Sequence, residues 1–226
     1  MKKSWKTRAN IAIATTGVLL FSALPAQAVT SLEDSATSKN SEILQAVSKE
    51  GDLTIKQAEV LHEEVEKGSL SLWVNGEKVE PYQFNTAARG YQAKTWAACH
   101  SNWSKDVQKT VRVFVPTTPI RNNVVLRCGT SGWGYRHMLG ADQQKRWAPL
   151  AAMVGANWRD FVDFTMETTV KNPYRVSPRP SNGTINIRGI VQLKKYDGKT
   201  IYTNYPDIAA DARDGRVITV IPKSTK

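Results

Sequence analysis

The stretch TINIRGIVQL, residues 184–193, decides the fold class, because polar and apolar side chains alternate along it. Alternation with a period of two is typical of a β-strand that turns one face toward a core. We therefore expect residues 184–193 to form one strand. One face would carry Ile185, Ile187, Gly189 and Val191, and the other Asn186, Arg188 and Ile190.

Turn and strand signals continue toward the C-terminus. Residues 197–198 and 214–215 are Asp-Gly turn dipeptides, and the segments that follow them, 201–205 and 216–221, have strand character. Hairpin turns of this kind join antiparallel neighbours. The last part of the chain is therefore expected to form a small antiparallel β-sheet.

Helices are predicted before this sheet. Apolar residues recur at helical spacing over 141–147 and 150–168, and Pro149 is expected to divide the two helices. Prolines at positions 173, 178 and 180 favour an irregular linker after them. The sequence thus predicts an α+β fold in which helices are followed by a small antiparallel β-sheet.

An acidic segment, residues 29–84, precedes this module. It is predicted to form an N-terminal helical hairpin, with helices near 41–50 and 53–68, and then a short β-hairpin around Asn75-Gly76. Further strands are expected over 107–115 and 124–128. We place a domain boundary near residue 85.

The charge of the chain, +11 overall, is unevenly distributed. Residues 29–84 carry 5 basic and 11 acidic side chains, a net charge of −6, whereas residues 85–226 carry 22 basic and 9 acidic ones, a net charge of +13. This asymmetry indicates a polyanion-binding module behind an acidic segment. The alternative is that the charge serves only the solubility of a small exported domain.

Residues 1–28 have the pattern of a signal peptide. Four basic residues precede an apolar run over 11–24, and Ala26-Gln27-Ala28 is a small-residue cleavage site. We expect a secreted protein, extracellular or associated with the cell wall, that begins at Val29 and has no stable membrane insertion after cleavage. An anchor that stays attached is the alternative, but the run is short for a bilayer.

Cys99 and Cys128 are the two cysteines of the chain. In the oxidising compartment that export implies, a disulfide between them is the simplest expectation. A catalytic thiol, or a metal site that uses Cys99 and His100, is the competing interpretation. No paired ligand spacing of a zinc site is present, so we predict no metal.

The run CGTSGWGYRH, residues 128–137, is the strongest candidate for a functional site. It brings flexible glycines, Arg136 and an imidazole together at an expected helix start, where backbone N–H groups and a cation would favour a phosphate. A histidine also titrates near neutral pH. His137 is accordingly a candidate catalytic residue, and a structural histidine beneath the helix is the alternative.

Metal-free cleavage of RNA needs a base, an acid and cations for the charge at phosphorus. Arg188 on the predicted strand and Thr219 near a turn are candidate partners of His137. Trp133, Tyr135 and Tyr202 are candidates for stacking on unpaired bases. Serine-hydrolase elbows, zinc-protease helices and phosphate-binding P-loops are absent from the sequence.

The run at 134–137, the tryptophan-bearing helices and the closing segment 215–222 resemble the small bacterial toxin nucleases of the barnase/EndoU/colicin/RelE-like group. The resemblance covers about residues 128–222. In that group a histidine at a helix and polar or basic residues on a following antiparallel sheet form the RNA-cleaving site. The resemblance implies that His137 is the general base or acid, Arg136 a phosphate contact and Thr219 a site hydroxyl. A second histidine soon after the first, present in many relatives, is missing here.

Two hypotheses follow from the sequence. The first is a secreted basic protein with a ribonuclease-like domain that binds and cleaves RNA through His137, Arg136, Arg188 and Thr219, without a cofactor. The second is a non-enzymatic protein that binds cell-wall or other polyanions on the same scaffold. In either case an inhibitor protein, or the acidic segment 29–84 folded back on the basic module, is a candidate partner.

Overall fold

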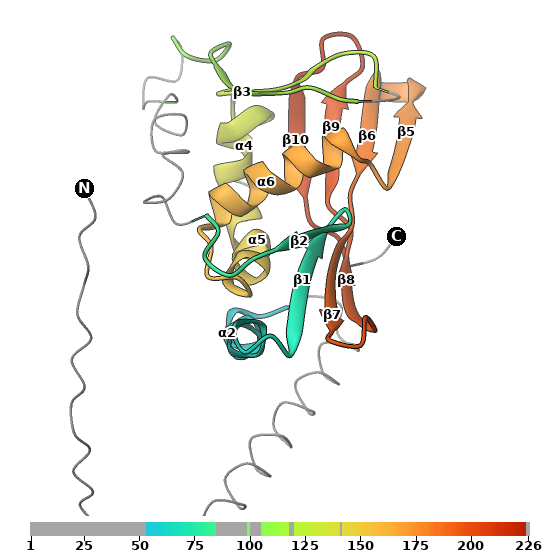
Figure 1. Cartoon of the computed structure of the whole chain (residues 1–226). Helices are drawn as coiled ribbons and strands as arrows, with labels where there is room; N and C mark the ends of the chain where they lie inside the picture. The colour runs from blue at the N-terminus through green and yellow to red at the C-terminus, as the bar shows by residue number, and fades with distance from the viewer. Residues whose placement is uncertain (1–52, 85–98, 100–104, 118–119, 141, 225–226) are drawn as a thin grey trace, which may run out of the picture. The chain divides into compact units, whose positions relative to one another are not determined.

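The computed structural model describes residues 53–84, 99, 105–117, 120–140 and 142–224. All of them belong to one compact unit that runs from Lys39 to Lys226. Helices and antiparallel sheets build this unit, so the α+β class is confirmed (Figure 1). The expected signal peptide, the expected helix at 41–50 and therefore the first half of the helical hairpin lie outside the described residues.

The described residues form three antiparallel sheets. The first has the strand order β10-β9-β6-β5, the second β2-β1-β7-β8, and the third pairs β3 with β4. Their bounds are β1 Leu70–Val74, β2 Glu77–Val79, β3 Thr110–Phe114, β4 Val124–Arg127, β5 Arg175–Arg179, β6 Thr184–Arg188, β7 Val191–Lys195, β8 Thr200–Asn204, β9 Asp207–Asp211 and β10 Val217–Ile221. The expected strands at 70–74, 107–115, 124–128, 201–205 and 216–221 are therefore present.

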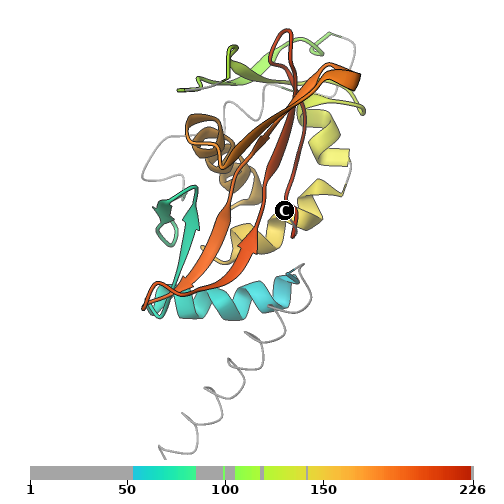
Figure 2. The same ribbon diagram turned by 90° about the vertical axis from the view of Figure 1, so that its right-hand side faces the viewer.

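The stretch 184–193 forms two strands in two different sheets, so the prediction of one strand is wrong. The break falls at Gly189, whose N–H donates a hydrogen bond to the carbonyl of Pro206, the residue before β9. A Cβ at Gly189 would lie 2.3 Å from Oγ1 of Thr169, so only glycine fits this approach to a helix. Figure 2 shows how β6 runs on into β7 beside β8 and β9, which makes one long bent hairpin shared by the two sheets.

Helix α2, Ile55–Glu66, confirms the helix that the sequence predicts over 53–68. Thr54 caps it in a capping box with Gln57, because each side chain accepts a hydrogen bond from the other residue's backbone N–H. The β-hairpin around Asn75-Gly76 follows, and β1 pairs with β7 over its whole length. The described part of the acidic segment thus lies within the same compact unit as the basic residues after position 85.

Three helices lie between β4 and β5: α4 Gly134–Gly140, α5 Gln143–Ala152 and α6 Trp158–Lys171. Pro149 lies inside α5, so the expected break at this residue is wrong. A proline removes only one backbone donor, and Pro149 is buried here. Helix α5 ends instead before Gly155, which adopts a left-handed φ of +63° that favours glycine.

Part of the expected proline-rich linker, Arg175–Arg179, forms a strand, so the prediction of an irregular linker is wrong there. Strand β5 contains Pro178 and pairs with β6 alone, at the edge of its sheet. A proline is tolerated there because an edge strand needs only half of its backbone N–H groups for pairing. The residues 175–179 are therefore placed on the sheet and not in a loop.

Helix α6 crosses one face of the sheet β10-β9-β6-β5 (Figure 1). Ile187 of β6 and Ile208 of β9 are fully buried with Phe161 and Met166 of α6 in the core. Side chains alternate along a strand, so the neighbours of these isoleucines project from the opposite face. That opposite face carries polar residues.

Candidate functional site

The Gly-rich run is anchored at its start by a disulfide between Cys99 and Cys128, which confirms that pairing. The run then turns back on itself: a Cβ at Gly129 would lie 2.0 Å from the carbonyl oxygen of Trp133, and one at Gly134 would lie 2.7 Å from that of Arg127. Both glycines have positive φ. Close backbone packing therefore accounts for two of the glycines that singled out this run in the sequence.

His137 lies on α4, half-buried, with Nδ1 2.6 Å from the carbonyl oxygen of Ser131. A carbonyl can only accept a hydrogen bond, so Nδ1 carries the proton and, in the neutral ring, Nε2 keeps its lone pair. Arg136 is 5% exposed, and its guanidinium donates to the carbonyl of Gly129. Its backbone N–H donates to Cys128. Through these two hydrogen bonds, Arg136 stabilises the backbone conformation of the run 128–137.

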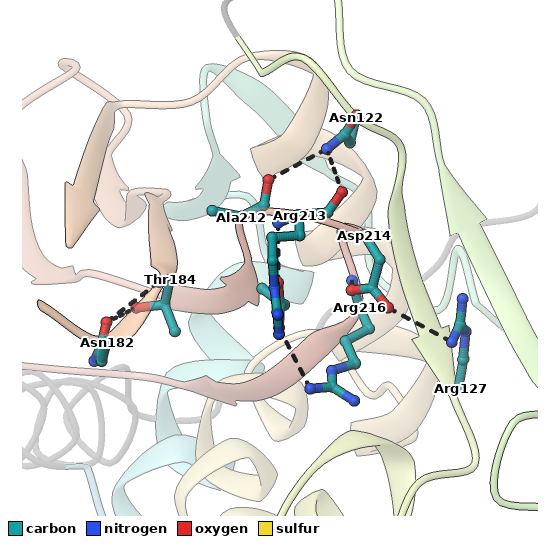
Figure 3. Close-up of polar contacts among 9 residues, drawn as sticks. Asn122, Arg127, Asn182, Thr184, Ala212, Arg213, Asp214 and Arg216 are labelled. Atoms are coloured by element: carbon teal, nitrogen blue, oxygen red, sulfur yellow. Dashed lines mark hydrogen bonds and ion pairs between the residues drawn. The ribbon is translucent and has the colours of Figure 1, made fainter. Parts of the chain in front are cut away.

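Trp133 packs against the turn between β9 and β10. The guanidinium of Arg216 lies 5.1 Å from the centre of the Trp133 ring, a cation–π arrangement. Arg213 and Arg216 both donate to Asp211. The Asn122 amide donates to the carbonyls of Ala212 and Arg213 in this turn (Figure 3). The predicted stacking residue therefore has a cation above its ring.

The two predicted stacking tyrosines are buried. Tyr135 is 4% exposed and accepts a hydrogen bond from Arg159, and burial raises the pKa of its hydroxyl although Arg159 opposes the shift. Tyr202 on β8 is 6% exposed, and its hydroxyl accepts from Asn204. Their rings form part of the core and present no open face for a base.

Arg188 and Thr219 lie together on the polar face of the sheet β10-β9-β6-β5. Two adjoining hollows of about 210 and 200 Å³ occupy this face, and Arg179, Asn186 and Asp207 line both. We call the two hollows the cationic groove. Its further charged members are Arg175, Arg188 and Lys223. Neither His137 nor Arg136 is among the lining residues.

Asp207 lines both hollows and positions a cation of each. Its Oδ2 accepts hydrogen bonds from Asn186 at 3.1 Å, Arg188 at 3.2 Å and Lys223 at 2.5 Å. Burial opposes ionisation of this carboxyl, but the bonds from Lys223 and Arg188 outweigh burial and hold its pKa below the ordinary value. Asp207 is thus a carboxylate that fixes the positions of two cations.

The groove carries a net positive charge. Four cations, Arg175, Arg179, Arg188 and Lys223, surround the single carboxylate of Asp207. Arg175 and Arg179 are exposed, and neither has an ion-pair partner among the residues that the structure describes. Sequence reasoning missed both arginines because the neighbouring prolines indicated a linker. Alternation of Arg175, Ser177 and Arg179 with Val176 and Pro178 was the signal that could have found them.

Metal-ligand clusters and membrane-spanning helices are both absent from residues 53–84, 99, 105–117, 120–140 and 142–224. There, no three His, Cys, Asp or Glu side chains converge as metal ligands would. In the same part of the chain, none of the helices combines the length and the apolar character needed to cross a bilayer.

Comparison with known proteins adds two distant relatives. No family model matches the chain, and no solved structure matches it significantly. Two uncharacterised proteins of Mycobacterium tuberculosis, from strains CDC 1551 and H37Rv, are each 30% identical to it over 145 residues. The match covers 60% of this chain and 52% of each relative, so the chain spans about half the length of the curated relatives it matches.

Proposed function

We propose that this is an exported basic protein that binds a polyanion, with RNA as the leading ligand, through the cationic groove. The supporting observation is that four cations and only one buried carboxylate line the groove on this sheet face. Arginines bind phosphate oxygens in a bidentate manner, and two of these arginines are exposed and available. If the function is non-enzymatic, cell-wall polyanions would bind in the same groove.

A salt series on the purified protein tests this function. RNA affinity should fall steeply as salt rises, because each neutralised phosphate releases counterions. The double variant Arg175→Gln with Arg179→Gln should bind at least about tenfold more weakly at low salt. Lys199→Gln, at an exposed lysine in the turn between β7 and β8, removes charge away from the groove and should bind like the parent. Equal affinity of parent and double variant would refute groove binding.

Metal-free cleavage of RNA is a second candidate function, supported by the hydrogen bond from His137 to Ser131. With Nδ1 held as a donor, Nε2 is the nitrogen that would accept the proton of a ribose 2′-hydroxyl. The ring of Trp133 and the guanidinium of Arg216 lie beside the same run, where they would supply stacking and positive charge. Arg188 and Thr219 belong to the groove, and in this proposal they hold the substrate strand.

Turnover of RNA by the purified protein in the presence of a chelator tests cleavage. His137→Gln keeps a polar side chain at this half-buried position of α4 and should abolish turnover while RNA affinity and thermal unfolding stay unchanged. Turnover that persists in His137→Gln removes this histidine from the mechanism. Absence of turnover in the parent, together with salt-sensitive binding, leaves the non-enzymatic function.

An acidic inhibitor segment is proposed for residues 29–52 only. The rest of the acidic segment supplies α2, β1 and β2 to the compact unit and cannot leave without breaking the pairing of β1 with β7. Deletion of residues 29–52 should raise RNA affinity at low salt and have less effect at high salt. Unchanged affinity after deletion would argue against inhibition by this segment.

Export is proposed from residues 1–28. The expected product, secreted or associated with the cell wall, has Val29 as its first residue. N-terminal sequencing of the protein recovered from the culture medium or the cell wall tests both the compartment and the cleavage point. A product that still begins before Val29 would refute the cleavage.

A further inference from the structure

The two hollows of the cationic groove share one cation. Arg179 lines both, whereas Arg175 and Arg188 line only one of them and Lys223 and Thr219 only the other. The first hollow therefore contains three guanidinium groups, and the second contains Arg179, Lys223 and neutral donors. Each hollow has its own set of cations, and Arg179 stands between them.

Strand register sets the spacing of these cations. Arg175 of β5 lies directly opposite Arg188 of β6, and Arg179 lies opposite Thr184 at the other end of the same pairing. Four residues of an antiparallel strand span about 13 Å, so Arg175 and Arg179 lie at opposite ends of the first hollow, and Arg179 is at the end that adjoins the second. Ser177 and Asn186, opposite each other between these ends, are neutral. The separation leaves room for more than one anionic group along the strands.

Asp207 positions the cations of the groove and does not itself bind the anion. It is 4% exposed and accepts from Arg188 and Lys223, one cation from each hollow. The carboxylate therefore fixes the position of two long side chains that would otherwise be mobile, which lowers the entropy lost when an anion binds. Both hollows are preorganised by the same buried group.

We propose that the groove holds two successive phosphates of a linear phosphodiester chain, one in each hollow, with Arg179 contacting both. This inference rests on the proposed polyanion binding and names the ligand chemistry. The guanidinium groups bind phosphate oxygens, and the hydroxyls and amide between them face the uncharged units that link the phosphates. RNA and glycerol-phosphate wall polymers share this backbone chemistry.

Calorimetric titration with short ligands tests the two-phosphate geometry. Uridine monophosphate provides one phosphate, and a uridine dinucleotide with a 5′-terminal phosphate provides two in succession. Binding of linked groups at adjoining subsites raises affinity well beyond that of either group alone, so the two-phosphate ligand should bind at least about tenfold more tightly. Equal affinity of the two ligands would overturn the proposal.

Three variants separate the subsites. Arg179→Gln should remove the gain from the second phosphate, because Arg179 is the one cation that lines both hollows. Arg175→Gln should weaken the dinucleotide and make the slope of log affinity against log salt shallower by about 0.7, the value for one lost contact to a single strand. Lys199→Gln should leave both quantities as in the parent. A tenfold gain retained by Arg179→Gln would also overturn the proposal.

The ligand source is tested with matched polymers. Oligouridylate, oligothymidylate and poly(glycerol phosphate) of equal phosphate number carry the same backbone charge. Stronger binding of either RNA or the glycerol polymer supports the proposal and assigns the source, whereas hyaluronate, a polyanion of carboxylates, should bind more weakly than all three. Hyaluronate binding as tight as theirs would leave polyanion binding intact and overturn phosphate recognition. Failure of every polymer to bind would instead refute the proposed function.

Discussion

Asn75 and Ile190, 115 residues apart, are joined by a reciprocal pair of hydrogen bonds. The backbone N–H of Asn75 donates to the carbonyl of Ile190 at 2.8 Å, and the N–H of Ile190 donates to Oδ1 of Asn75 at 2.8 Å. The Asn75 amide also donates to Oγ1 of Thr169 on α6. The turn of the first β-hairpin therefore holds the bend between β6 and β7 against a helix.

Asn75→Ala should destabilise the protein by about 2 kcal/mol, because it leaves the N–H of Ile190 without its acceptor and places alanine at a φ of +50°. Urea unfolding followed by circular dichroism measures the change. Asn123→Ala, at an exposed side chain, is the matched control and should cost less than about 0.5 kcal/mol. Equal losses in the two variants would contradict the role given to Asn75.

Gly134→Ala should be strongly destabilising, by about 2 to 3 kcal/mol, because its Cβ would lie 2.7 Å from the carbonyl oxygen of Arg127 and its φ is +77°. Gly132→Ala lies two residues earlier in the same run, where the nearest atom to a new Cβ is 3.8 Å away. That control should be nearly neutral. Similar thermal stabilities of both variants would show that the run is not packed as described.

Removal of the disulfide by Cys99→Ser with Cys128→Ser should lower the free energy of unfolding by roughly 2–4 kcal/mol, since the unfolded chain regains the freedom of a closed loop. The bridged residues are 29 positions apart. Chemical unfolding of the parent under reducing conditions should reproduce the loss. A parent whose stability does not respond to reduction would contradict the bridge.

Asp211 should contribute stability that depends on pH. Hydrogen bonds from the guanidinium and backbone N–H of Arg213, together with the charge of Arg216, lower the pKa of Asp211 from 3.8 to about 2. Because the folded-state pKa is the lower one, this contribution is complete above pH 3.8 and is lost as the pH falls toward 2. Asp211→Asn should therefore be less stable than the parent at pH 7, and the difference should shrink across that window. A constant difference would contradict the ion pairs.

The sequence predicted the elements whose pattern is local. The β-hairpin at Asn75-Gly76, helix α2 and strands β8 and β10 all combine a clear period with turn or end signals. Strand β9, residues 207–211, was missed because Asp and Ala are unfavourable in strands. Its place is set by pairing with β6 and β10 on both sides, which no local pattern reveals.

The candidate site was predicted in part. Alternation placed Arg188 on the face opposite Ile187, and both Arg188 and Thr219 do line the groove. The sequence did not predict Arg175 and Arg179 as site residues, because Pro178 indicated a loop. The structure has an edge strand here, and an edge strand tolerates that proline. The sequence also proposed Arg136, Tyr135 and Tyr202 because their residue types are suited to binding. In the folded protein all three side chains are buried and support the structure. Burial of this kind depends on contacts distant in sequence.

The most direct test of groove binding is an NMR titration of the arginine Nε–Hε signals with oligouridylate. We predict shifts at Arg175, Arg179 and Arg188 that saturate together, while Arg159, which donates to the buried Tyr135 hydroxyl, stays unchanged. Shifts confined to Arg127, Arg213 and Arg216 at the turn between β9 and β10, with none at the three groove arginines, would contradict groove binding.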